Sequence, residues 1–177
     1  MDTNNNSNSL NVKRIDLTVN PSEICEKGVQ IVRMVRPEWS EKEISVKIFT
    51  DGLTNRLIGC YLPQNPSDKV LVRVFGEKTE IYIDREIELQ IMVDLHNNSF
   101  GPPVYCAFNN GIVYGFEDGI ILDKHLVRKP EIAYKIAAKM AKMHTLQILN
   151  NSKREALVFQ LMRKFLQQLF EATLIDR

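Results

Sequence analysis

Three short apolar runs with the composition of β-strands follow one another in the first half of the chain. They are EISVKIF, RLIGCYL and KVLVRVF, which lie between residues 43 and 75 and are rich in β-branched and aromatic side chains. A polar turn, residues 50–55, separates the first two, and the proline-containing segment PQNPSD separates the second and third. This pattern predicts an antiparallel meander of three strands.

A helix is predicted before the meander. Asn20 is a suitable N-cap, Pro21 occupies the first helical position, and Glu23 follows three residues after the cap. Pro37 cannot continue a helix, so we expect the helix to cover about residues 21–35.

A second helix and a hairpin are predicted after the meander. Four residues of IDREIELQIMVDLHNN repeat at offsets of three, four and seven, which places them on one helical face: Glu88, Ile91, Met92 and Leu95. The segment VYCAFNNGIVYGF then has the pattern of a hairpin with Asn110–Gly111 at its tip. We therefore expect a sheet of about five strands.

The chain beyond residue 122 has helical periodicity, and its last predicted helix, residues 153–172, carries an apolar stripe. The stripe consists of two adjacent rows of four residues: Leu157, Leu161, Phe165 and Leu169, then Val158, Met162, Leu166 and Phe170. Other helices compete for the sheet, so we expect this stripe to be partly exposed and to support self-association or binding of a partner. Burial of the stripe within the domain is the alternative.

Composition limits the classes of partner and site. With 23 basic and 22 acidic residues, the formal charge of +1 does not favour nucleic acid or an anionic membrane. The cysteines, Cys25, Cys60 and Cys106, are odd in number and widely spaced, which indicates core thiols rather than disulfides or a zinc site. No apolar run approaches a membrane span, and the first residues, MDTNNNSNSLN, are too polar for a signal peptide. We therefore expect a cytoplasmic protein whose residues 1–19 form a largely disordered head.

Arg73 is the most informative single residue. It interrupts VLVRVF, in which both faces of the strand are otherwise apolar, as in a central strand. A guanidinium group in that place needs an anionic partner, and Glu88, Glu86 or the phosphate of a ligand are the candidates. The alternative is an arginine that extends along the rim of the sheet to solvent.

The order of these elements is that of a kinase small lobe, in which a glycine-containing turn joins two strands and a buried cation faces a helix carboxylate. The chain lacks the Gly-x-Gly-x-x-Gly pattern, the Val-Ala-Ile-Lys lysine and the GxxxxGK motif. From the residues alone, a nucleotide-binding lobe is therefore one open hypothesis.

Four segments in this order resemble the amino-terminal half of the choline/ethanolamine kinase family: FTDGLTNRLIGCYL, VLVRVFGEKTEIYIDREIE, PPVYCAFNNGIVYGF and AAKMAKMH. The resemblance covers residues 20–149 and extends more weakly to 170. The TDG turn and the NNG hairpin are more similar to the ethanolamine kinases than to the choline kinases. The resemblance implies an α+β fold: a protein-kinase-like small lobe over 20–119, with an antiparallel sheet and one packed helix, then the first helices of an incomplete large lobe over 120–177.

The resemblance also implies site residues. The loop over the phosphates of ATP would be Asp51, Gly52, Leu53, Thr54 and Asn55. Arg73 would contact the phosphates, and Glu88 would orient it, with Glu86 as the second choice. Phe116 and Glu117 would belong to the segment between lobes that meets adenine. ATP and Mg²⁺ are the implied cofactors.

The family's His-Asn-Asp motif and its later metal-binding aspartate do not occur in the 177 residues. We therefore expect no catalytic residue or metal ligand here, and structural or surface roles for His96, His125 and His144. The first hypothesis is an ethanolamine kinase of phosphatidylethanolamine biosynthesis whose present chain is inactive alone. The alternatives are a non-catalytic nucleotide-binding or regulatory interaction protein and, within the family, a choline kinase.

Overall fold

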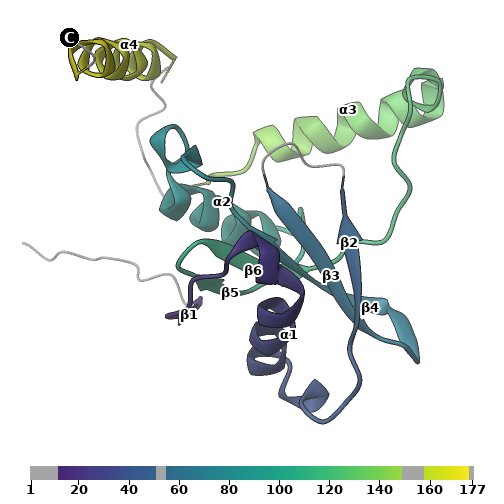
Figure 1. Ribbon diagram of the computed structural model, residues 1–177. Helices are drawn as coiled ribbons and strands as arrows, with labels where there is room; N and C mark the ends of the chain where they lie inside the picture. Colours follow the sequence, from purple (N-terminus) through teal and green to yellow (C-terminus); the bar gives the residue numbers. More distant parts are fainter. Residues whose placement is uncertain (1–11, 51–54, 149–157, 176–177) are drawn as a thin grey trace, which may run out of the picture.

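A computed structural model describes residues 12–50, 55–148 and 158–175, with side chains described up to 171 (Figure 1). Six strands form one sheet in the order β1-β5-β6-β4-β3-β2. In chain order they are β1 (Lys13–Ile15), β2 (Ser45–Phe49), β3 (Arg56–Leu62), β4 (Asn65–Val74), β5 (Val104–Phe108) and β6 (Gly111–Gly115). The helices are α1 (Ile24–Val35), α2 (Arg85–Asn97), α3 (Pro130–His144) and α4 (Val158–Ile175). The α+β class expected from the sequence is therefore confirmed.

The predicted first helix is confirmed. Asn20 Oδ1 accepts a hydrogen bond of 3.1 Å from the backbone N–H of Ser22, and a single 3-10 turn (Pro21–Glu23) leads into α1. Pro37 begins a further 3-10 turn instead of continuing α1. The local capping and proline signals therefore set both helix boundaries.

The predicted meander is also confirmed, because β2 pairs with β3 and β3 with β4, both antiparallel. The expected PQNPSD loop is wrong, since β4 already begins at Asn65 and only two residues connect it to β3. Pro66 is tolerated because β6 pairs with β4 only from Val70 onward, so the start of β4 has one free edge that needs no N–H donor.

The expected disordered head is wrong for residues 12–19, and residues 1–11 lie outside the described ranges. Here β1 pairs in parallel with β5, which makes the sheet mixed and six-stranded rather than antiparallel and five-stranded. Val19 is fully buried, and its backbone N–H and C=O exchange hydrogen bonds of 2.9 Å with the side chain of Asn110. The end of this segment at Val19 is therefore held by the hairpin tip, about ninety residues later in the chain.

The predicted hairpin forms, but its tip lies one residue earlier than expected. Asn109 and Asn110 connect the strands, and Gly111 is the first residue of β6, paired with Phe108. A Cβ at Gly111 would lie 2.1 Å from Phe108 Cζ and 2.3 Å from the carbonyl oxygen of Arg73. Glycine is therefore required by the close approach of neighbouring groups and not by a turn conformation.

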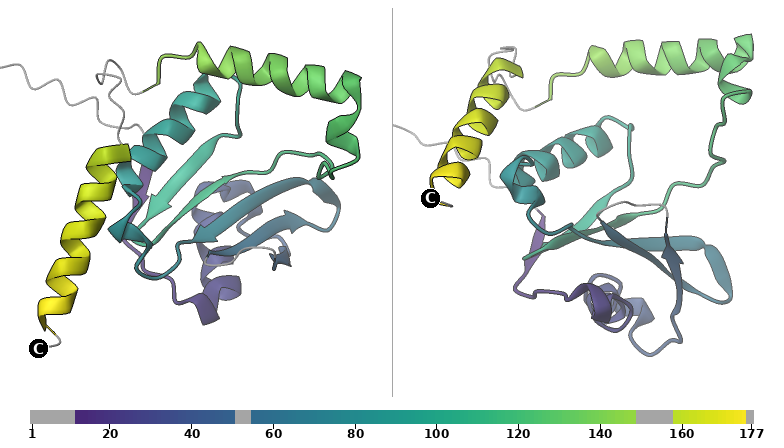
Figure 2. Two further views of the ribbon diagram at one scale, coloured as in Figure 1. Left: turned by 90° about the horizontal axis from the view of Figure 1, so that it is seen from above. Right: turned by 45° about the horizontal axis from the view of Figure 1, so that its top comes forward.

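The two faces of the sheet carry separate core clusters, with α1 and α2 on opposite sides (Figure 2). The larger cluster packs α1 against β3 and β4, and its fully buried members are Val19, Ile31, Val32, Ile58, Cys60, Val70, Val72, Val74, Cys106 and Val113. The smaller cluster lies under α2 and is centred on Leu89, Ala107 and Ile112. Burial raises the pKa of both Cys60 and Cys106 to about 12, so these two are core thiols as expected. Cys25 is exposed, so the same prediction is wrong for it.

The last two helices bury little apolar surface. No residue of α3 is buried, and Figure 2 shows α3 and α4 outside the sheet and its two covering helices. Leu161 and Phe165 are about two-fifths exposed and Leu169 is 63% exposed, which confirms the expected partial exposure of the stripe. Leu157 lies outside the described residues. Among the helices that the structure describes, none has the length and apolar character to cross a membrane.

Candidate functional site

Arg73 lies inside β4 on the face of the sheet that α2 covers. Successive side chains of a strand point to opposite faces, so its neighbours Val72 and Val74 enter the α1 core and are fully buried. The Arg73 side chain is 22% exposed. A charged group that is so largely buried needs a partner of opposite charge.

The partner is Glu88 on α2. Arg73 Nη1 donates to Glu88 Oε1 at 3.0 Å, and Glu88 is also about three-quarters buried. The N-cap Asp84 positions this carboxylate, because its side chain accepts from the backbone N–H of the second and third helical residues and fixes the start of α2. Of the candidates left open by the sequence, the structure therefore selects Glu88.

Glu86, the second choice, does not reach Arg73. It forms an ion pair with Arg14 of β1 at 2.5 Å, and both side chains are more than half exposed. The physical reason is helical geometry, since residues two apart on a helix point about 200° apart and cannot face the same strand.

Sequence analysis missed a second guanidinium group, that of Arg85. Arg85 Nη1 donates to Glu88 Oε2 at 2.5 Å, so each oxygen of this carboxylate has its own arginine. Arg85 Nη2 also donates to Thr79 Oγ1, and its guanidinium group lies 3.9 Å from the centroid of the Phe75 ring. The sequence did indicate this ion pair, because Arg85 precedes Glu88 by three residues and side chains at that spacing meet on a helix.

The cluster of Arg73, Arg85 and Glu88 has two positive groups and one negative group. Its side chains are between 17% and 23% exposed, and Glu86 is engaged by Arg14. The cluster therefore carries a formal charge of +1 in a largely desolvated position. Such a group favours the approach of an anion, and the planar guanidinium suits carboxylates and phosphates.

The two strands that flank the predicted phosphate loop, β2 and β3, lie in the same sheet as Arg73, and β3 is the direct neighbour of its strand. Phe49 pairs with Leu57 across the turn, and Leu57 pairs with Arg73, so one cross-strand row joins the base of the turn to the guanidinium strand. Asn55 precedes β3 and is half-buried. The other four predicted loop residues, 51–54, lie outside the described ranges, so their role stays a prediction.

Phe116 and Glu117 follow β6, and Phe116 lies beside the middle of β4. The backbone N–H of Phe116 donates to the carbonyl oxygen of Lys69 at 3.2 Å, and Lys69 Nζ lies 4.7 Å from the centroid of the Phe116 ring. Lys69 and Arg73 are four residues apart on β4, a distance of roughly 13 Å along a strand. The structure thus places Phe116 near the cluster's sheet face without bringing it into contact with the arginines.

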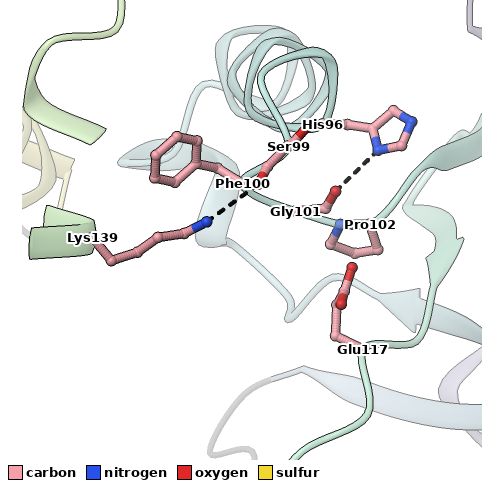
Figure 3. A pocket seen from close by; sticks show the side chains of 7 residues that line it. All are labelled: His96, Ser99, Phe100, Gly101, Pro102, Glu117 and Lys139. Carbon is pink, nitrogen blue, oxygen red and sulfur yellow. Dashed lines mark hydrogen bonds between the residues drawn. The ribbon is translucent and has the colours of Figure 1, made fainter. Parts of the chain in front are cut away.

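Glu117 is exposed and lines a pocket of about 530 Å³ below the end of α2 (Figure 3). The other lining residues are His96, Ser99, Phe100, Gly101, Pro102 and Lys139. His96 Nδ1 lies 3.0 Å from the carbonyl oxygen of Gly101, and Lys139 Nζ donates to that of Ser99 at 3.3 Å. His96 therefore has the structural role expected from the sequence, and this pocket is separate from the arginine cluster.

The remaining histidines lie at the surface, as expected from the sequence. His125 and His144 are both exposed, at the entry to a 3-10 turn and at the end of α3. Within residues 12–50, 55–148 and 158–171, no group of three His, Cys, Asp or Glu side chains could hold a metal ion. The described residues thus provide a cluster with an excess of positive charge, and its binding of an anion stays a prediction.

Comparison with known proteins identifies the family. The family model described as choline/ethanolamine kinase matches residues 46–176. Human ethanolamine kinase 1 is 39% identical over 145 residues, which are 80% of this chain and 32% of the relative. Human ethanolamine kinase 2 is 38% identical over 130 residues, 73% of this chain and 34% of the relative. The chain therefore spans about a third of the length of these relatives.

Solved structures share the fold. Plasmodium vivax ethanolamine kinase superposes with a TM-score of 0.65 at 24% identity, covering 86% of this chain and 42% of that chain. Choline kinase from Cryptosporidium parvum gives a TM-score of 0.64 at 24% identity, covering 77% of this chain and 40% of that chain. The family match covers well over half of the sequence, and the chain therefore belongs to the choline/ethanolamine kinase family.

Proposed function

We propose that this chain is the ATP-phosphate-binding part of an ethanolamine kinase, which transfers a phosphoryl group from ATP to ethanolamine. The observation that carries the proposal is the cluster of Arg73, Arg85 and Glu88, whose excess positive charge lies on the sheet beside the start of β3, where Arg73 pairs with Leu57. The relatives named as ethanolamine kinases support the same assignment.

In this proposal Arg73 binds the phosphates of ATP. Its described hydrogen bond to Glu88 uses Nη1 alone, which leaves other donors of the guanidinium fork for phosphate oxygens. Backbone N–H groups of the turn that contains Gly52 would approach the same oxygens, because glycine has no Cβ to block them. Phe116 and Glu117 would meet adenine.

Mg²⁺ would accompany ATP and neutralise charge on its phosphates. The described residues offer no cluster of carboxylates for this ion, so we assign it no ligand in this segment. The proposed product, phosphoethanolamine, would enter phosphatidylethanolamine synthesis. Choline remains the alternative acceptor, because the family and the structural relatives include choline kinase.

Calorimetric titration of the 177-residue chain with MgATP tests the binding role. We expect saturable binding that Arg73→Met weakens roughly tenfold or more, because one charged hydrogen-bonding group to phosphate is removed. Arg14→Met is the matched control, since it removes an arginine that pairs with the same helix at the exposed Glu86. Equal ATP affinity in wild type and Arg73→Met would refute the proposed role.

Catalysis is tested separately. The chain contains no His-Asn-Asp motif, so we expect no phosphoethanolamine when the pure 177-residue chain is incubated with MgATP and ethanolamine. Mass-spectrometric detection of phosphoethanolamine above a protein-free control would show that the 177-residue chain is sufficient for phosphoryl transfer. It would contradict the proposal that this chain supplies only the part that binds the phosphates of ATP.

A further inference from the structure

We propose that Arg85 is a positioning residue for the phosphate-binding arginine, acting through the second oxygen of Glu88. The inference rests on the proposed function, since it assigns to Arg85 the task of aiming Arg73 at ATP. It concerns a residue that the strand-and-helix pattern of the sequence did not single out.

The geometry of the carboxylate is the first argument. Glu88 Oε1 accepts from Arg73 and Oε2 accepts from Arg85, at 3.0 and 2.5 Å. A carboxylate with one arginine can rotate about its last torsion, whose energy profile is broad. With a second arginine on the other oxygen, the carboxylate plane is fixed, and the direction of the Arg73 guanidinium is fixed with it.

The second argument is that Arg85 is itself held by neutral and aromatic groups. Its Nη2 donates to Thr79 Oγ1, and this hydroxyl donates in turn to the carbonyl oxygen of Gly76 at 2.7 Å. Thr79 is 3% exposed, and the ring of Phe75 covers the guanidinium plane at 3.9 Å. Arg85 therefore connects the 76–79 segment after β4 to the α2 carboxylate.

The geometry of Arg85 also allows positioning to be distinguished from a long-range effect of its charge. Lysine would keep the positive charge of Arg85 but presents one ammonium group in place of a planar fork. A single ammonium cannot reproduce the geometry that bridges Glu88 and Thr79 while stacking on Phe75. Arg85→Lys therefore removes the positioning of Glu88 while it keeps the positive charge at this place.

The test measures MgATP affinity by calorimetry, and melting temperature without ligand, for the 177-residue chain. The variants are Arg85→Lys, Glu88→Gln and the double variant, with Arg14→Lys as the control at the exposed ion pair of the same helix. We expect Arg85→Lys to bind ATP about tenfold more weakly, within the range of coupling between contacting residues. We expect the double variant to bind no more weakly than Glu88→Gln alone, and Arg14→Lys to bind like wild type.

Each other outcome overturns the inference. Wild-type affinity in Arg85→Lys would show that Arg85 contributes charge or structure only. If the double variant loses ATP affinity by the product of the two single-variant factors, Arg85 acts on ATP directly and not through Glu88. If Arg85→Lys does not fold, Arg85→Gln, which can bond one partner but not both, is judged by the same criteria.

The design also separates this inference from the proposed function. If Arg73→Met weakens ATP binding while Arg85→Lys does not, the proposed function stands and the positioning role alone is wrong. If the wild-type chain binds no ATP, or Arg73→Met leaves the affinity unchanged, the proposed function fails and the positioning role fails with it.

Discussion

Replacing Glu88 by glutamine should destabilise the fold more than replacing Arg73 by methionine, although both changes break the same ion pair. After Arg73→Met, Glu88 keeps its hydrogen bond to Arg85, so no carboxylate is left unpaired. After Glu88→Gln, both arginines lose their only described carboxylate and face each other across a neutral amide.

The expected loss in the free energy of unfolding follows, for each variant, from the number of charge-assisted hydrogen bonds that it removes. A hydrogen bond to a charged group contributes about 1.5–3 kcal/mol net, and the partial exposure of these side chains favours the lower end of that range. Arg73→Met removes one such bond and should cost about 1.5 kcal/mol. Glu88→Gln weakens two and leaves two uncompensated cations, which should cost about 3 kcal/mol.

Urea denaturation followed by circular dichroism measures both values as changes in the free energy of unfolding at constant m-value. Added salt should reduce the cost of Glu88→Gln, since it screens the repulsion between the two arginines. Glu86→Gln is the matched control, because the same chemical change in an exposed pair should cost under about 1 kcal/mol. A cost for Arg73→Met equal to or above that for Glu88→Gln would refute the reasoning.

Three further outcomes are expected. Gly111→Ala should destabilise the fold by about 3 kcal/mol in urea denaturation, because its Cβ would overlap backbone of the neighbouring strand, whereas Gly101→Ala, with no atom within 4 Å of the new Cβ, should change little. The thiols of both buried cysteines have a pKa near 9 in the unfolded chain and about 12 in the fold. Their contribution to the free energy of unfolding is therefore complete below pH 9 and is lost as the pH rises toward 12, because the unfolded thiols ionise first. Cys60→Ala should make this fall shallower, by about 1.4 kcal/mol at pH 10; an unchanged pH dependence would contradict it. The exposed stripe of α4 should cause concentration-dependent self-association in analytical ultracentrifugation, which Leu161→Glu with Phe165→Glu should abolish; a monomeric parent would count against it.

Local signals in the sequence determined the elements whose causes are local. The N-cap at Asn20 and the prolines at 21 and 37 set the first helix, and alternating apolar runs set the meander, because capping and strand patterns depend on adjacent residues. The apolar setting of Arg73 likewise showed that this residue needs an anion, since desolvation penalises any unpaired charge.

Contacts between distant segments could not be read in the same way. The three residues of β1, two of them basic, are too few to give a strand pattern, and they form a strand only because β5, some ninety residues later, offers a free edge. Gly111 reads as a turn residue, yet its need for glycine comes from the carbonyl oxygen of Arg73 on another strand.

The candidate site shows the same division. The residues of the sequence left both Glu88 and Glu86 open as partners for Arg73, with Glu86 the second choice by family resemblance, and the rotation of α2 on the sheet decides for Glu88. That rotation is set by Leu89, which is buried against Ala107 and Ile112 and so turns its neighbour Glu88 toward β4. Arg85 was visible as a local pair with Glu88, but its anchor on Thr79 was not. The tertiary structure decides these partners because burial fixes which face of a helix meets the sheet, and that depends on residues far apart in the chain.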